Sequence, residues 1–160
     1  MNVDAILDTF NQTGVNYLLI GGMNFLLRHQ PILTFDVDLW IEDTVSNRRA
    51  CEAALATLGA EWGATETDWQ PVAKRAAGWL DRQAVFCLYS PQGAIDIFRA
   101  VPGLGDWLES NESAISAQTS SGIRYKGISD ADMLKCQLAL DPGQQKAERI
   151  KVLQRHLGQE

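Results

Sequence analysis

The chain has 160 residues, a formal net charge of −6 at pH 7 and 46% hydrophobic residues. This length suits a single domain over residues 1–160, which can bury a core without a disulfide or a structural metal. The acidic balance argues against broad, non-specific binding to nucleic acid, which needs lysine and arginine to neutralise phosphates. The sequence opens without a leader pattern and contains no run of about 18 apolar residues, so we expect a cytoplasmic protein that does not enter a membrane.

The cysteines and histidines give no sign of a metal site. The cysteines are Cys51, Cys87 and Cys136, an odd number without a CxxC pair. We interpret them as buried free thiols in a reducing compartment. His29 and His156 are too few and too far apart in sequence to predict a zinc site.

The first third of the chain alternates helices and strands. Apolar residues at helical spacing predict a helix over 3–13, which Gly14 ends. The apolar run 16–20 predicts a buried strand that stops at Gly21-Gly22, and residues 23–29 then have a helical pattern.

The next segment has a strict two-residue alternation over 34–41. Phe35, Val37, Leu39 and Ile41 share one face, which we expect to be buried, while Asp36, Asp38 and Trp40 share the other. A helix over 46–58 follows, with Gly59 as its stop.

The second half predicts a hairpin, a strand and two helices. Strands are expected over 84–89 and 94–99, short helix and loop over 103–117, a last strand over 123–128, and helices that begin near Ser129 and near Asp141-Pro142. The tryptophan-rich stretch 60–82 shows no period. The fold class is therefore α+β, with a mixed β-sheet of about five strands packed by helices.

Two aspartates mark the first candidate site. Asp36 and Asp38 lie two residues apart, so on a strand their side chains point to the same face. Neighbouring carboxylates repel each other unless a cation lies between them, and Mg²⁺ prefers such oxygen ligands. The alternative is that this face of the strand is simply solvated.

Two further elements strengthen the case. Gly21-Gly22, between a strand and a helix, would allow a close approach of backbone N–H groups to a phosphate; the alternative is a plain turn. Asp96 places a carboxylate in an apolar strand, where a charge is costly unless it is paired or bound to a metal. The alternative is that Asp96 reaches solvent or pairs with Arg99.

The order of these elements resembles that of the nucleotidyltransferase superfamily of the DNA polymerase β type, in particular the minimal nucleotidyltransferases and AbiEii-like toxin nucleotidyltransferases. The segments that carry the resemblance are Leu18–Met23, Thr34–Ile41, Ile95–Phe98 and Gly127–Lys135. Together they reach across roughly residues 3 to 157. The resemblance implies the nucleotidyltransferase fold and a metal-dependent transfer of a nucleoside monophosphate from an NTP to a hydroxyl of a protein, RNA or small-molecule acceptor.

The same resemblance implies residue roles. Asp36, Asp38 and Asp96 would form the catalytic and metal-binding set for Mg²⁺ or Mn²⁺, with Asp96 as the acid that assists the attacking hydroxyl. Gly21, Gly22 and Lys135 would bind the nucleotide phosphates; for the lysine, the alternative is an exposed helix residue.

The sequence also departs from the family pattern. Met23 stands where many members have serine, Ile32 where relatives in the toxin branch often have arginine, and Gln145–Glu148 where an aspartate pair is common. These departures keep open a second interpretation, a catalytically weak binding module such as an antitoxin or adaptor. One interpretation of residues 60–82 is that they form a wall that binds the acceptor or the base, with Arg75 or Arg82 near the triphosphate. The alternative is that the tryptophans of this stretch belong to the hydrophobic core.

Overall fold

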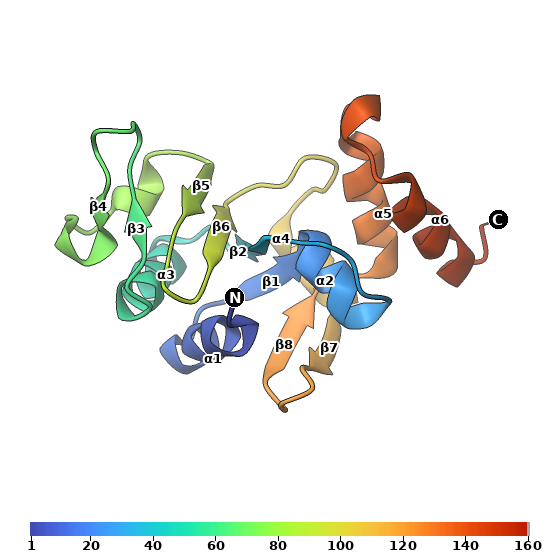
Figure 1. Cartoon of the computed structure of the whole chain (residues 1–160), viewed down its shortest axis with the longest axis horizontal. Coiled ribbons are helices and arrows are strands. Elements are labelled where there is room, and N and C mark those ends of the chain that lie inside the picture. The colour runs from blue at the N-terminus through green and yellow to red at the C-terminus, as the bar shows by residue number, and fades with distance from the viewer. Residues whose placement is uncertain (160) are drawn as a thin grey trace.

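The computed structural model describes residues 1–159 and places one six-stranded sheet among its helices (Figure 1). The elements, in chain order, are α1 (Val3–Thr13), β1 (Tyr17–Ile20), α2 (Gly21–Arg28), β2 (Asp36–Ile41), α3 (Val45–Thr57), β3 (Glu61–Trp62), β4 (Gln70–Pro71), β5 (Val85–Leu88), β6 (Ala94–Phe98), α4 (Trp107–Ser113), β7 (Ile115–Gln118), β8 (Arg124–Gly127), α5 (Asp130–Ala139) and α6 (Ala147–His156). Short 3₁₀ turns cover Val72–Lys74, Trp79–Asp81 and Pro142–Gln144.

The sheet is mixed, in the order β5-β6-β2-β1-β8-β7. The pairs β2–β6 and β1–β8 are parallel, and the other three pairs are antiparallel. The predicted α+β class with a mixed sheet is therefore confirmed. The sixth strand, β7, begins at Ile115, within the segment 103–117 for which the sequence predicts only short helix and loop. β7 is an edge strand with mostly exposed side chains, so its sequence lacks the apolar alternation that would predict a strand.

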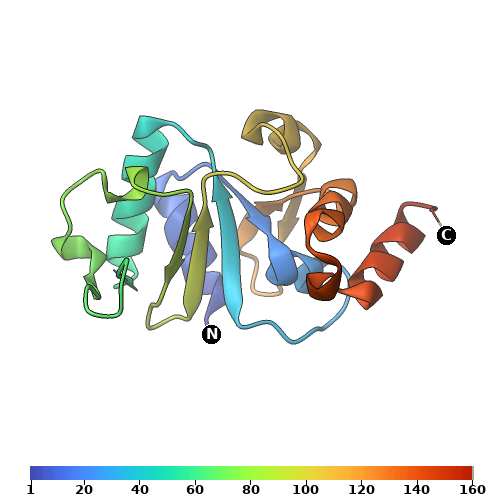
Figure 2. The ribbon, with the colours of Figure 1, turned by 90° about the horizontal axis from the view of Figure 1, so that it is seen from above.

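Both faces of the sheet carry apolar side chains. On one face Val37, Leu39 and Ile97 belong to a core with α1 and α3, and Figure 2 shows these two helices behind β5, β6 and β2. On the other face Leu18 and Trp40 belong to a second core with α4, α5 and α6, and α5 and α6 lie together at the opposite end of the molecule from α3.

The expected faces of the segment 34–41 need two corrections. Phe35 is 72% exposed because it precedes β2 and does not share its buried face. Trp40 is only 1% exposed although it lies on the aspartate side of β2. The reason is tertiary: the indole N–H of Trp107 in α4 donates to the Trp40 carbonyl at 3.0 Å, and this part of the sheet is covered.

Two helices begin at different residues from those predicted. α2 begins at Gly21 and not at residue 23, so both glycines lie in its first turn. After the turn Pro142–Gln144 the chain is extended at Gln145, and α6 begins only at Ala147. Gly143 is a weak helix former, which explains why one continuous helix from Asp141 does not form.

The tryptophan-rich stretch packs on the α1–α3 face of the sheet. Trp62 and Trp79 are stacked with ring centroids 5.7 Å apart and belong to the core there, which agrees with the core alternative. The Arg75 guanidinium donates to the Trp62 carbonyl at 2.7 Å and lies over its ring. For Trp62, Trp79 and Arg75 the hypothesis of an active-site wall is therefore wrong, because the aspartates lie on the other face of the sheet. Trp69 is 48% exposed and does not fit the core alternative.

The cysteines also differ from expectation at one position. Cys51 is buried and Cys136 is half-buried, but Cys87 is exposed, because it alternates with the inward-pointing Phe86 and Leu88 on β5. All three are free thiols. Within residues 1–159, no helix has the length and apolar character needed to cross a membrane.

Candidate active site

Three carboxylates meet on the open part of the sheet. β2 and β6 run parallel with Asp38 directly opposite Asp96, and Asp36 lies two residues before Asp38 on the same face. One carboxylate oxygen from each residue lies within 4.8 Å of the others. The fold thus brings together the three aspartates that the sequence singles out, and Arg99 pairs with Asp43 rather than with Asp96.

The electrostatics of this cluster favour a bound cation. Burial, followed by the charges of Asp36 and Asp96, raises the pKa of Asp38 to about 8. Burial and Asp36 raise the pKa of Asp96 to about 6. The Asp38 Oδ1 atom is buried without a hydrogen-bond partner among the described residues. Three crowded carboxylates with an unpaired buried oxygen fit a hard divalent cation such as Mg²⁺ or Mn²⁺.

Gly21 allows the first turn of α2 to touch this cluster. Its φ of +69° lies in the left-handed region that favours glycine. A Cβ atom at this position would overlap the Asp38 Oδ2 atom. Any side chain at residue 21 would therefore displace the Asp38 carboxylate or the helix.

The N-terminus of α2 also has the character of a phosphate site. Its N-cap residue, Ile20, has no side-chain oxygen to accept from the first N–H groups, and the helix carries no acidic residue in its first turn. The uncapped N–H groups and the positive end of the helix dipole attract anions. A Cβ atom on Gly22 would lie 2.9 Å from Thr34 Oγ1 and 3.1 Å from Arg149 Nη2, so the backbone there is closely approached by a cationic side chain.

Arg149 is the residue that the sequence reasoning missed. It belongs to α6, and its guanidinium lies near Gly22 and 5.9 Å from the centre of the Phe25 ring. Its charge acts on Asp38, and burial lowers its own pKa. Arg149 lies more than 110 residues after Asp38 in sequence, and only the packing of α6 brings it to the site, so no local pattern could have identified it.

Lys135 lies apart from this cluster. Its side chain is 63% exposed and contacts Asp132 at 3.8 Å, in a cleft shared with Gly103 and Glu109. A different pocket, lined by Gly21, Phe25, Gln137 and Arg149 among others, adjoins the N-terminus of α2. The fold thus brings together the three aspartates and the two glycines predicted for the site, Asp36, Asp38, Asp96, Gly21 and Gly22. Lys135 lies outside this group.

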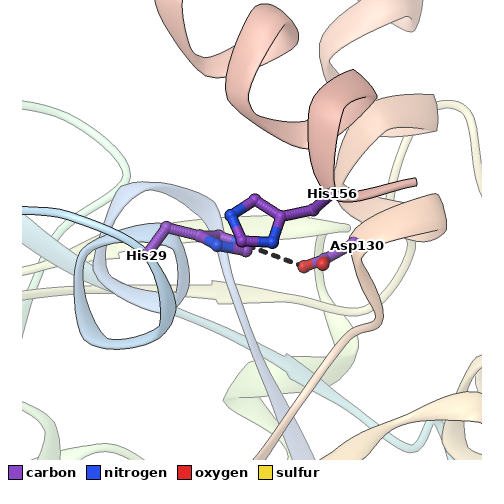
Figure 3. Close-up of side chains that lie close together, drawn as sticks. All are labelled: His29, Asp130 and His156. Carbon is purple, nitrogen blue, oxygen red and sulfur yellow. Dashed lines mark hydrogen bonds and ion pairs between the residues drawn. The ribbon is translucent and has the colours of Figure 1, made fainter. Parts of the chain in front are cut away.

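The two histidines lie side by side in the fold. The rings of His29 and His156 have centroids 4.4 Å apart, and both lie beside Asp130 (Figure 3). Their separation in sequence is therefore no argument against a shared site, because the end of α2 meets the end of α6.

Comparisons with known proteins support the class of fold. No model of a known protein family matches the sequence, and a search of curated proteins also gives no match. Solved structures do match: the chain has the nucleotidyltransferase fold.

Three of these structures illustrate the likeness. ANT(2″)-Ia, solved in complex with adenylyl-2″-tobramycin, has a TM-score of 0.64 and 15% identity over 98% of this chain and 87% of that one. The lincosamide antibiotic adenylyltransferase LnuA, lincomycin-bound, has a TM-score of 0.61 and 18% identity over 93% and 92%. A candidate nucleotidyltransferase from Thermotoga maritima has a TM-score of 0.57 and 16% identity over 97% and 89%.

Proposed function

We propose that this protein is a metal-dependent nucleotidyltransferase that transfers a nucleoside monophosphate from an NTP to a hydroxyl of an acceptor. The observation that carries the proposal is the meeting of Asp36, Asp38 and Asp96 beside the first turn of α2. Such a reaction needs two parts side by side: a carboxylate cluster that binds the cation and a helix N-terminus that binds the phosphates. The nucleotidyltransferase fold of the neighbouring structures supports the same reaction class.

Each residue has a role that follows from its position. Asp36, Asp38 and Asp96 would hold Mg²⁺ or Mn²⁺, which when bound stabilises negative charge on phosphate oxygens. The N–H groups at Gly21 and Gly22 bind phosphate oxygens, and the Arg149 guanidinium adds positive charge next to them.

Asp96 is the residue best suited to take the proton of the acceptor. In the metal-free cluster, burial and Asp36 raise the pKa of Asp96 to about 6, so this carboxylate is a stronger base than an ordinary aspartate. In the proposed step, the acceptor oxygen forms a bond to the α-phosphorus, its proton passes to an Asp96 oxygen, and the bond to pyrophosphate breaks. Lys135 lines another cleft and contacts Asp132, so we assign it no role in phosphate binding.

A small-molecule acceptor is favoured over RNA. Two neighbouring structures contain antibiotics, adenylyl-tobramycin in one and lincomycin in the other. The net charge of −6 disfavours an RNA acceptor, which needs a basic groove. The cell extract in the experiment below also tests a protein acceptor.

The second candidate function is a binding module with this fold and weak or no catalysis, such as an antitoxin or adaptor. Met23 is the specific observation in its favour, since the first turn of α2 offers no hydroxyl to the phosphates. Such a module would not bind NTP in a metal-dependent manner.

The test is label transfer from each of the four α-labelled NTPs with Mg²⁺. Acceptors are a set of hydroxyl-bearing small molecules, including aminoglycosides and lincosamides, and a cell extract. We expect transfer by the wild type, with loss of about 10³-fold or more in Asp36→Asn/Asp38→Asn, because removing charge at the reacting centre costs several kcal/mol. Asp141→Asn, which changes an exposed aspartate outside the cluster, is the matched control and should keep full activity. Equal transfer by the double variant would refute the proposal.

A further inference from the structure

A second cluster of potential metal ligands lies outside the candidate active site. His29 directly follows α2, Asp130 is the first residue of α5, and His156 is the last residue of α6. One ligand atom from each lies within 4.8 Å of the others. Figure 3 shows the His29 ring pointing toward Asp130, with the His156 ring next to the His29 ring.

The cluster has the chemistry of a transition-metal site. Two imidazoles and one carboxylate are a common set of three protein ligands for Zn²⁺, with a fourth position left for water. Imidazole nitrogen also favours Zn²⁺, Co²⁺ or Ni²⁺ over Mg²⁺, so this cluster differs in preference from the three aspartates. His156 is exposed, which leaves a path for an ion to enter.

The surrounding residues hold two of the ligands in place. The His29 side chain is only 5% exposed, and its Nε2 lies 2.8 Å from Asp130 Oδ1. The Arg28 guanidinium donates to the same Oδ1 at 2.9 Å and to the Ile128 carbonyl at 3.0 Å. Both contacts to Asp130 use Oδ1, so Oδ2 is available to an ion, and hydrogen bonds of this kind orient a ligating carboxylate.

The protein alone does not complete the polar contacts of His29. Its Nδ1 atom is buried and has no hydrogen-bond partner among the described residues. A half-satisfied imidazole held against a carboxylate and a second imidazole is a costly arrangement for a purely structural cluster. An ion bound between the three side chains would replace the contact between His29 Nε2 and Asp130 and would offset the cost of crowding these groups together.

We propose that His29, Asp130 and His156 bind a divalent transition-metal ion of the zinc type, with the fourth coordination position open to water. The ion would join the end of α2 to the start of α5 and the end of α6. Such a clamp matters because α6 buries only Val152 and Leu153 and carries Arg149, which reaches the first turn of α2. The site thereby fixes the position of Arg149 without itself touching a nucleotide.

The experiment measures Zn²⁺ binding by calorimetric titration of protein without a histidine tag. The triple variant Asp36→Asn/Asp38→Asn/Asp96→Asn serves as the background, so that the aspartate cluster cannot contribute. We expect this background to bind one Zn²⁺ per chain and to show a higher melting temperature with Zn²⁺.

Adding His156→Gln to the background should lower the Zn²⁺ affinity about 100-fold or more and remove the thermal shift. His156 is exposed, so this change should leave folding intact. Adding Lys151→Gln instead, an exposed change on the same helix, should alter neither result. No stoichiometric Zn²⁺ binding by the background, or unchanged binding after His156→Gln, would overturn the proposal. Neither result depends on whether the protein transfers nucleotides.

Discussion

The Asp38 carboxylate makes the metal-free protein lose stability as the pH rises. Its pKa is about 8 in the fold, against an ordinary value of 3.8, because of burial and the charges of Asp36 and Asp96. Between these two pH values the folded state holds a proton that the unfolded state has released. The stabilising contribution of the Asp38 proton is therefore complete below about pH 4 and is lost progressively as the pH rises towards 8.

The size of the effect follows from the shift. Each pKa unit corresponds to about 1.4 kcal/mol, so a fully desolvated Asp38 would give an upper limit of about 5–6 kcal/mol. Asp38 is only partly buried, and solvent screening reduces this to roughly 2–3 kcal/mol. About two-thirds of this change, roughly 1.5–2 kcal/mol, falls between pH 5 and pH 8, and for a chain of this length it corresponds to a fall in melting temperature of roughly 3–8 °C.

The assay is a set of melting curves at pH 5 to 8 for the wild type and Asp38→Asn, in EDTA and in excess Mg²⁺. Asp38→Asn should melt higher than the wild type at pH 8 in EDTA, and the difference between the two should shrink steadily as the pH falls to 5. At a concentration about 100 times its dissociation constant, Mg²⁺ should raise the free energy of unfolding of the wild type by about 2.7 kcal/mol at pH 8. It should raise that of the variant only slightly. Parallel pH profiles in EDTA, or equal stabilisation of both proteins by Mg²⁺, would refute the reasoning.

Three further changes test other parts of the structure. Gly21→Ala, which adds a Cβ against Asp38 at a positive φ, should lower stability by about 2 kcal/mol and abolish metal-dependent nucleotide binding, measured by melting curves and calorimetry. Arg149→Gln should raise the KM for NTP about 10-fold or more in the transfer assay, while Lys151→Gln should not change it. Glu52→Ala removes the carboxylate that accepts hydrogen bonds from the Gly78 and Leu80 N–H groups. It should lower the free energy of unfolding by about 2–4 kcal/mol and leave nucleotide binding intact. An unchanged free energy of unfolding in chemical denaturation would contradict this.

The strands and helices that build the site could be predicted because their local patterns agree with the fold. The alternation over 34–41 and the apolar run 16–20 correspond to β2 and β1, and Gly14 ends α1 with a φ of +76°. The pairing of Asp38 with Asp96 needs only that β2 and β6 become parallel neighbours. Local spacing and element order were therefore enough to propose the carboxylate cluster.

The features that sequence reasoning missed all depend on tertiary packing. Trp40 is buried because α4 covers it, and β7 forms because β8 offers an edge. Arg149 reaches the site, and His156 reaches His29, only because α6 packs against α2. None of these contacts leaves a short-range signal in the chain.

The most direct test of the candidate active site is calorimetric titration of the protein with ATP, GTP, CTP and UTP, each with Mg²⁺ and with EDTA. If the three aspartates and the first turn of α2 form one metal and phosphate site, at least one nucleotide binds with Mg²⁺. That binding should be lost in EDTA and in Asp36→Asn/Asp38→Asn, whose fold is checked by its melting curve. Binding that persists in EDTA or in this variant, or no binding of any of the four nucleotides with Mg²⁺, would contradict the proposed site.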